Sequence, residues 1–154
     1  MSLKIYSILG VLKMFDKILI PTDGSDFSEN EVKRATQLLA EDGEIIILSV
    51  ASKIEANTPF HNKKNVHRMN KEFKKEAQMN ADRMARKFDK SVNVRRLVIA
   101  GIPSETIVNV ADNEDVDLIM IAASGKSGLK KFFIGSVAER VLKTTEKDVL
   151  LIRN

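Results

Sequence analysis

The sequence contains no cysteine and only two histidines among its 154 residues. Without thiolates, the chain can build neither a disulfide framework nor a cysteine-bound zinc site. His61 and His67 have no carboxylate or second histidine at metal-ligand spacing, and no Ser-His-Asp or Cys-His arrangement can be assembled. We therefore expect no metal site and no catalytic residue. The absence of cysteine also fits a cytoplasmic protein.

The sequence also lacks an apolar run long enough to span a bilayer. Residues 5–12 form a short apolar run, but the start of the chain has no basic segment and no small-residue cleavage site typical of a secretory signal. Periodic structure begins just after Met14, which could be an alternative start. We expect residues 1–13 to be an N-terminal extension or alternative-start segment, residues 14–154 to form one domain, and no membrane partner.

Five short apolar runs alternate with helix-like segments. The expected strands are residues 17–22, 44–50, 92–100, 116–123 and 148–152. The expected helices are a segment opened by a Ser28–Glu31 capping box and ending near Leu39, then residues 66–88, 104–113 and 137–143. The central runs are continuously apolar, as in parallel strands that are covered on both faces. This order predicts a doubly wound α/β sheet.

The long helix predicted for residues 66–88 has a local excess of positive charge around it. Residues 61–90 contain ten Lys or Arg against four Asp or Glu, a net charge of +6, so the rest of the chain sums to −2. An anionic partner could bind such a segment, but the solvated face of a helix is the commoner cause. Its apolar positions are Met69, Phe73, Ala77, Met84 and Phe88. Both aromatic residues are expected in the core, which argues against a nucleic-acid partner.

Polar segments follow the first, second and fourth predicted strands, and they read "PTDGSD", "SVAS" and "AASGKSG". In open α/β sheets, ligands bind beyond the carboxyl ends of the strands, where the strand order reverses. Asp23 could accept hydrogen bonds there from an adenine amine or from ribose hydroxyls, or hold a metal. Its alternative role is an Asx turn that shapes the loop after the first strand.

Two common phosphate-binding motifs are excluded. A Walker A loop needs a glycine five positions before Gly125, where Met120 stands instead, and no GxGxxG opens the first crossover. The start of the last helix remains as a candidate, because free N–H groups there suit an anion. Alternatively, Ser136 only caps this helix, with Glu139 completing a capping box. The possible phosphate donors are Gly125, Lys126, Ser127, Gly135, Ser136 and Val137.

Four stretches together resemble the universal stress protein family. They are "ILIPTDGSDFSENEV", "IIILSV", "VIAGIPSETIVNVADNEDVDLIMIAASGKSG" and "FFIGSVAERVLKTTEKDVLLIR", and the resemblance covers residues 15–153. It implies a five-stranded parallel sheet of order 3-2-1-4-5 with helices on both faces. It also implies a homodimer through the C-terminal strand, which would otherwise be an exposed apolar edge.

One branch of this family binds ATP through the motif G-x2-G-x9-G-[S/T]. The second and third glycines fall on Gly125 and Gly135, but Ala122 replaces the first, and Ser124 stands where many members carry histidine. If position 122 required a left-handed backbone, alanine would cost about 1–2 kcal/mol. The resemblance assigns adenine or ribose contacts to Asp23 and Val50. The full expected nucleotide-binding set is Pro21, Thr22, Asp23, Val50, Ile121, Ala122, Ser124, Gly125, Lys126, Ser127, Gly135, Ser136 and Val137.

The resemblance therefore implies a stress-response regulatory module that binds ATP or another adenine nucleotide, together with Mg²⁺ shared among phosphate oxygens. No base is positioned to activate water and no arginine finger can be assigned, so we expect at most slow ATP hydrolysis. The main alternative is a nucleotide-free dimeric interaction module of the same family, which Ala122 favours. A nucleotidyl transferase or ATP pyrophosphatase is disfavoured because no "SGGxDS"-type loop follows the first strand. The sequence does not identify a downstream protein partner.

Overall fold

Five parallel strands form a single sheet of order β3-β2-β1-β4-β5, which confirms the predicted fold class. The structure is a computed structural model that describes residues 14–25, 29–55, 62–123 and 134–152. The elements are β1 (Phe15–Pro21), α1 (Glu29–Leu38), β2 (Leu39–Ala51), α2 (Lys63–Ala85), β3 (Asn93–Ala100), α3 (Pro103–Asn113), β4 (Leu118–Ala122), α4 (Ser136–Thr144) and β5 (Asp148–Ile152).

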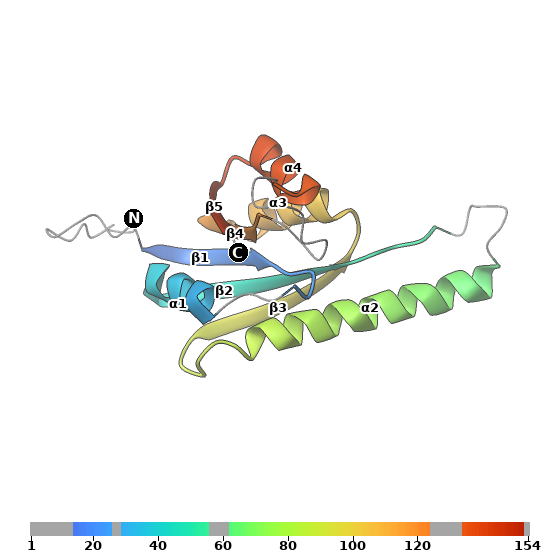
Figure 1. Ribbon diagram of the computed structural model, residues 1–154, viewed down its shortest axis with the longest axis horizontal. Helices are drawn as coiled ribbons and strands as arrows, with labels where there is room; N and C mark the ends of the chain where they lie inside the picture. Colours follow the sequence, from blue (N-terminus) through green and yellow to red (C-terminus); the bar gives the residue numbers. More distant parts are fainter. Residues whose placement is uncertain (1–13, 26–28, 56–61, 124–133, 153–154) are drawn as a thin grey trace, which may run out of the picture.

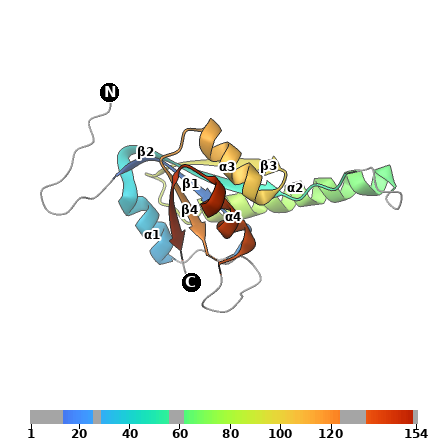
Figure 2. The ribbon, with the colours of Figure 1, turned by 90° about the horizontal axis from the view of Figure 1, so that it is seen from above.

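Helices cover both faces of the sheet, with α1 and α2 on one side and α3 and α4 on the other (Figures 1 and 2). Alternate strand residues point to opposite faces, so the apolar strands supply two cores. Ile18 and Ile20 of β1 join the core under α1 and α2, whereas Leu19 joins the core under α3 and α4. All three have zero solvent exposure. Burying each such side chain stabilises the fold by about 1.5–3 kcal/mol.

The boundary between α1 and β2 differs from the expected one. Leu39 was expected to be the last apolar residue of the helix, with Gly43 as the break before the strand, but β2 already begins at Leu39. Phe15 pairs with Leu39 while Lys17 pairs with Glu44, so the start of β2 bulges outward from the regular register. Gly43 lies inside this bulge. A Cβ atom there would lie 2.8 Å from Leu39 Cδ1, so the glycine permits a close approach.

Helix α2 begins three residues earlier than expected and projects beyond the sheet (Figures 1 and 2). Asn62 caps it, because its side chain accepts a hydrogen bond from Lys64 N at 3.0 Å. Of the apolar residues expected on the inner face, Ala77, Met84 and Phe88 are buried. Met69 and Phe73 are only half-buried, because they lie in the N-terminal half that extends past the strands.

The chain leaving β2 is attached to the projecting part of α2. Asn70 donates from Nδ2 to the carbonyl of Ile54 at 2.9 Å, and Asn70 Oδ1 accepts from Ile54 N at 2.8 Å. One side chain therefore satisfies both backbone groups of a residue sixteen positions away. The two segments form a projection, which we call the α2 arm (residues 52–55 and 62–73). Among the described residues, no helix is long and apolar enough to cross a membrane.

A charged cluster joins three elements at the amino end of the strands. Arg95 of β3 donates to Glu44 of β2 at 2.9 Å and also forms an ion pair with Glu114, which follows α3. Hydrogen bonds from Arg95 hold the pKa of Glu114 below its ordinary range, and burial opposes this only in part. The hydrogen bonds that Arg95 donates to Glu114, and to a smaller degree those to Glu44, raise the pKa of Arg95, so the cluster stays charged.

Replacing Arg95 with glutamine should flatten the acid side of the stability profile. The pKa of Glu114 is lowered in the folded state, so its ionised form stabilises the protein at every pH above the ordinary pKa near 4.5. This contribution is lost as the pH falls through the lowered pKa of the folded protein. Urea unfolding at about pH 7 and about pH 3 should therefore give a smaller difference in unfolding free energy for Arg95→Gln than for the unmodified chain.

Arg96→Gln is the matched control for this experiment. Arg96 is the neighbouring arginine of β3, and it pairs with Asp82 at 2.7 Å instead of with Glu114. This variant should keep the pH dependence of the unmodified chain. If the unfolding free energy changed equally between the two pH values in all three proteins, the Arg95–Glu114 pair would contribute nothing to acid stability.

Candidate functional site

The carboxyl end of β1 leads into a tight turn at the edge of the sheet. Thr22 N donates to the carbonyl of Leu48 at 2.8 Å, which extends the pairing of β1 with β2 by one residue. Thr22 Oγ1 then accepts from Gly24 N at 3.2 Å, and Asp23 Oδ1 accepts from Ser25 N at 2.9 Å. The Asx turn that the sequence offered as an alternative role for Asp23 is confirmed. The carboxylate is exposed, and the turn fixes its direction beyond the strand end.

Helix α2 supports this turn from the side. Gly24 has φ of +84°, and a Cβ atom built on it would lie 2.4 Å from Asn80 Oδ1. Asn80 is buried, and Arg83 Nη1 donates to the carbonyl of Gly24 at 3.4 Å. Neither Asn80 nor Arg83 could be identified from the sequence, because a polar residue on a polar helix looks like part of its solvated face.

The start of α4 lies against the end of β4, as the predicted phosphate site requires. Gly135 N donates to the carbonyl of Ala123 at 2.6 Å, and Ala123 N donates to the carbonyl of Ile152 at 2.7 Å. The end of β4, the end of β5 and the first turn of α4 are thus held together by backbone hydrogen bonds. Chain segments far apart in sequence meet at the carboxyl edge of the sheet (Figure 2).

Ser136 does not cap α4, so the capping-box alternative is wrong. The N-cap is Gly135, with φ of −63° and ψ of 151°, and no side chain caps the helix. Ser136 is the first helical residue and is exposed. Glu139 pairs with Lys143 at 2.6 Å instead of reaching back to the helix start. Within the described residues, the backbone N–H of Ser136 therefore has no intramolecular acceptor, as expected for the first turn of a helix.

Ala122 is the last residue of β4 and pairs with Ile152. Among the described residues other than glycine, Asp115 alone has a positive φ, so Ala122 does not occupy the left-handed region. The strain that alanine would suffer there does not arise. What distinguishes Ala122 from glycine at this position is therefore one methyl group, which is half-buried.

The remaining predicted residues differ in what they expose. Pro21, Val50 and Val137 are half-buried at the carboxyl edge, and the two valines pack against the core under α3 and α4. Ile121 is 5% exposed, so its side chain belongs to that core and presents little surface to a ligand. The predicted residues Ser124, Gly125, Lys126 and Ser127 lie outside the described residues. In the described ranges, no cluster of three His, Asp or Glu residues could hold a metal ion.

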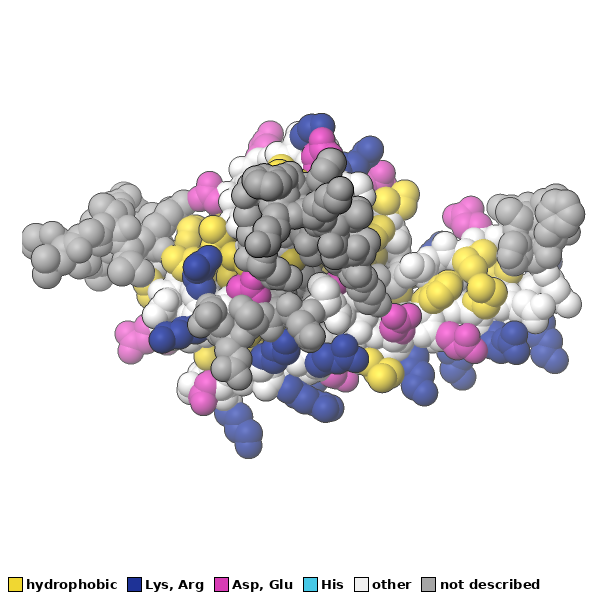
Figure 3. All heavy atoms as spheres, in the orientation of Figure 1, with side chains coloured by type: hydrophobic (Ala, Val, Ile, Leu, Met, Phe, Trp, Pro, Cys, Tyr) yellow, Lys and Arg dark blue, Asp and Glu magenta, His cyan; other side chains and the backbone are white. Residues whose placement is uncertain are grey.

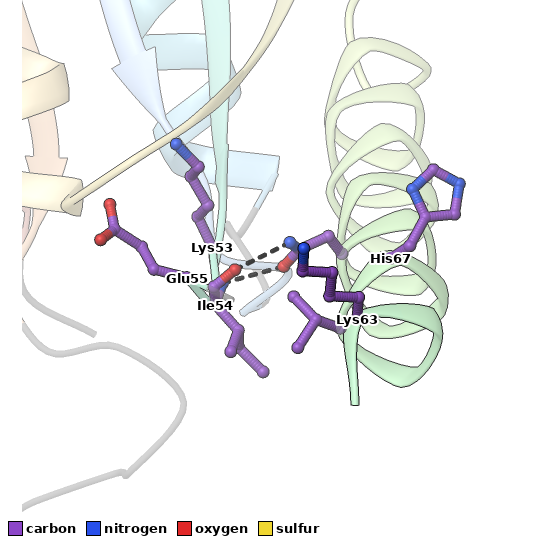
Figure 4. Close-up of a pocket in the computed structure, with 7 residues that line it drawn as sticks. Lys53, Ile54, Glu55, Lys63 and His67 are labelled. Atoms are coloured by element: carbon purple, nitrogen blue, oxygen red, sulfur yellow. Dashed lines mark hydrogen bonds between the residues drawn. The ribbon is translucent and has the colours of Figure 1, made fainter. Parts of the chain in front are cut away.

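A hollow of about 450 Å³ on the α2 arm contains none of the predicted residues. Asn70 and Val66 line it together with the five residues labelled in Figure 4. Lys53 and Glu55 point away from α2, and His67 points away from the β2 tail on the far side of the helix (Figure 4). These polar side chains therefore do not converge on a common point. The side-chain amide of Asn70 is already hydrogen-bonded to the backbone of Ile54. The arrangement is typical of a structural contact between two segments.

The candidate site therefore consists of an oriented aspartate and a helix start at the switch-point edge of a doubly wound parallel sheet. This geometry defines a class of α/β proteins that hold ligands beyond the ends of their strands. The chain matches the Universal stress protein family over residues 14–153. It belongs to that family, as the resemblance predicted.

Two relatives come from Methanocaldococcus jannaschii. The chain is 34% identical to universal stress protein MJ0577 over 157 residues, which cover 91% of this chain and 96% of that protein. It is 30% identical to universal stress protein MJ0531 over 164 residues, covering 99% of this chain and 93% of the relative. A solved structure of MJ0577 matches with a TM-score of 0.69 at 30% identity, covering 92% of this chain and 97% of that one.

More distant members of the same fold have been solved with nucleotides. One is an Arabidopsis thaliana family member with AMP bound, at 17% identity and a TM-score of 0.60, covering 90% of this chain and 91% of the other. Another is a universal stress protein of Archaeoglobus fulgidus in complex with dAMP, at 15% identity and a TM-score of 0.53, covering 90% and 98%. A third was solved with cAMP, at 23% identity and a TM-score of 0.54, covering 91% and 98%.

Replacing Gly24 with alanine should destabilise the turn that presents Asp23. The left-handed backbone alone costs about 1–2 kcal/mol for a residue with a Cβ atom. The new methyl would also lie 2.4 Å from Asn80 Oδ1. Urea unfolding should therefore show a loss of at least about 1 kcal/mol.

Asn80→Ala provides the control that separates the backbone strain at Gly24 from the steric clash of the new methyl group with Asn80. Truncating Asn80 removes the colliding oxygen and leaves the backbone strain, so the double variant should lose less stability than the sum of the two single variants. Full stability of Gly24→Ala would contradict the turn geometry described above.

Proposed function

We propose that the protein binds an adenine nucleotide, ATP or AMP, at the carboxyl edge of β1 and β4 and acts as a stress-response regulatory module. The observation that carries the proposal is the start of α4, where Gly135 N donates to the carbonyl of Ala123 and the amide of Ser136 has no acceptor among the described residues. Backbone N–H groups at a helix start, with the partial positive charge of the helix dipole, stabilise a phosphate.

Asp23 would serve the other end of the nucleotide. The Asx turn uses Oδ1 and orients an exposed carboxylate beyond the strand end. A carboxylate can accept hydrogen bonds from ribose hydroxyls or from the adenine amine. Half-buried Val50, at the end of the neighbouring strand, offers an apolar surface for the base. Family members solved with AMP, dAMP and cAMP support the choice of an adenine nucleotide.

Mg²⁺ would enter with the triphosphate. It keeps several waters and binds readily to phosphate oxygens, so it needs no dedicated carboxylate cluster in the protein. We expect any hydrolysis to be slow, because we can assign neither a base for water nor a cation aimed at the γ-phosphate. We also propose a cytoplasmic homodimer joined along β5, an edge strand of the sheet whose central apolar residues are half-buried.

Asp23→Asn tests the adenosine half of the site. Asparagine keeps the oxygen that accepts from Ser25 N, so the turn should survive while the negative charge is lost. A hydrogen bond to a charged group contributes about 1.5–3 kcal/mol, which corresponds to an affinity loss of about tenfold or more. Calorimetric titration with ATP and Mg²⁺ measures it.

Asp16→Asn is the matched control, because Asp16 is exposed near the opposite end of the same strand. It should bind ATP as the unmodified chain does. Unchanged affinity in Asp23→Asn would remove the carboxylate from the site. No detectable binding of ATP, AMP or cAMP to the unmodified chain would instead favour the nucleotide-free module, to which the methyl of Ala122 points.

Ser136→Pro tests the phosphate half of the site. Proline is well tolerated at the first position of a helix, where the N–H has no partner within the helix. The residue before it, Gly135, already has the extended backbone that proline requires. The substitution therefore removes one amide donor and one hydroxyl while keeping α4.

We expect Ser136→Pro to weaken ATP binding about tenfold or more, since a hydrogen bond to a charged oxygen is lost. Adenosine, which has no phosphate, should be affected little. Ser136→Ala keeps the amide and should show a smaller loss. If the proline variant binds ATP normally while its helix is intact by circular dichroism, the amide of Ser136 does not contact phosphate.

A further inference from the structure

Four basic residues form a continuous line along α2, and we call them the basic stripe: Lys64, Arg68, Lys71 and Lys75. They follow one another at spacings of four, three and four residues, so they share one face of the helix. All four are exposed. Lys and Arg side chains gather along the lower edge of the molecule in Figure 3, over α2.

The stripe points directly away from the body of the protein. Nine residues are about two and a half helical turns, and that interval separates Arg68 from buried Ala77 and Lys75 from buried Met84. The residues that pack against the sheet therefore lie on the side of α2 opposite to the stripe. Because the N-terminal half of α2 projects beyond the sheet, this face is open to a large partner.

No member of the stripe is neutralised within the described residues. None of the four takes part in an ion pair or a side-chain hydrogen bond there. The nearest carboxylate along α2 is Glu72, four residues after Arg68 and three before Lys75, and it forms no ion pair with either in the described part of the chain. In line with the stripe the next carboxylate is Asp82, which pairs with Arg96 of β3. Within the described residues, the cations of the stripe are therefore held in no internal ion pair.

The arrangement opposes the stability of the helix itself. Like charges three or four residues apart repel each other. Cations in the first turn also face the positive end of the helix dipole. The first turn of α2 has no acidic residue and begins with Lys63 and Lys64. Glu72 offsets part of this repulsion, but no carboxylate lies three or four residues from Lys64 or Lys71. An anionic partner would stabilise the arrangement.

We propose that the basic stripe binds the sugar–phosphate backbone of a nucleic-acid duplex, without regard to base sequence. From Lys64 to Lys75 the helix rises about 16 Å, over which one strand of a duplex presents about five phosphates. The chain has a pI near 9.3, and clustered Lys and Arg along one helix of a basic domain are the electrostatic footprint of such binding.

The geometry disfavours a lipid surface. A helix that lies in a membrane interface buries an apolar face in it, but the apolar face of α2 packs against β2 and β3. The sequence alone favoured a solvated helix face. The outward alignment of four unpaired cations on a projecting arm is what the structure adds.

The test is fluorescence anisotropy of the full chain with a labelled duplex DNA of about 20 base pairs. Four phosphate contacts predict that raising the salt from about 50 mM to about 200 mM lowers the binding constant about 150-fold. The triple variant Arg68→Gln, Lys71→Gln and Lys75→Gln leaves one contact, and its binding constant should fall only about three- to fourfold over the same range.

The matched control is the triple variant Lys33→Gln, Arg34→Gln and Lys90→Gln. It removes one arginine and two lysines that are exposed elsewhere, so both variants have the same net charge. The control should keep the affinity and salt dependence of the unmodified chain. Glutamine preserves helix propensity, and circular dichroism should show the stripe variant as fully helical and melting no lower than the control.

Equal losses in the two variants would overturn the proposal, since binding would then follow net charge alone. The proposal would also be overturned if anionic vesicles or polyglutamate competed with the duplex as effectively as unlabelled DNA. The stripe would then bind another kind of anion. Ser136→Pro should bind the duplex normally, so the outcome is separable from that of the nucleotide site.

Discussion

The burial of β1 at the centre of the sheet is the constraint on which the remaining structure depends. Ile18, Leu19 and Ile20 have no exposed surface and alternate between the two cores, so this strand holds both helical layers in place. The chain moves outward from β1 in one direction through β2 and β3, and in the other through β4 and β5. The reversal between β1 and β4 leaves an edge where loops diverge, and the candidate site lies at that edge.

The two halves of the candidate site are held by different means. The first turn of α4 is fixed by backbone hydrogen bonds from Gly135 to β4 and from Ala123 to β5. The turn at Asp23 is fixed by side chains, through the fit of Asn80 against Gly24 and the contact from Arg83. The proposed phosphate side is therefore held by the backbone of the sheet, whereas the proposed adenosine side depends on side chains of α2, which covers the other face of the sheet.

The sequence predicted the fold because its signals there were local and strong. Short apolar runs such as "ILI" and "IIIL", alternating with helical segments, are typical of buried parallel strands, and the family resemblance supplied their order. Prediction failed where contacts were non-local. The bulge at Leu39 depends on pairing with Phe15, and the support from Asn80 depends on a glycine 56 positions earlier. Ser136 was misjudged as an alternative cap because Gly135 satisfies that role with backbone geometry alone.

The clamp between Asn70 and Ile54 has a consequence for how this chain can vary. Its two hydrogen bonds close the connection between β2 and α2 into a ring, and they join the end of β2 to α2 directly. Closing a longer ring costs little extra entropy. Length changes between residues 55 and 62 should therefore cost the fold little stability, so that stretch is a suitable place to insert an epitope or a reporter.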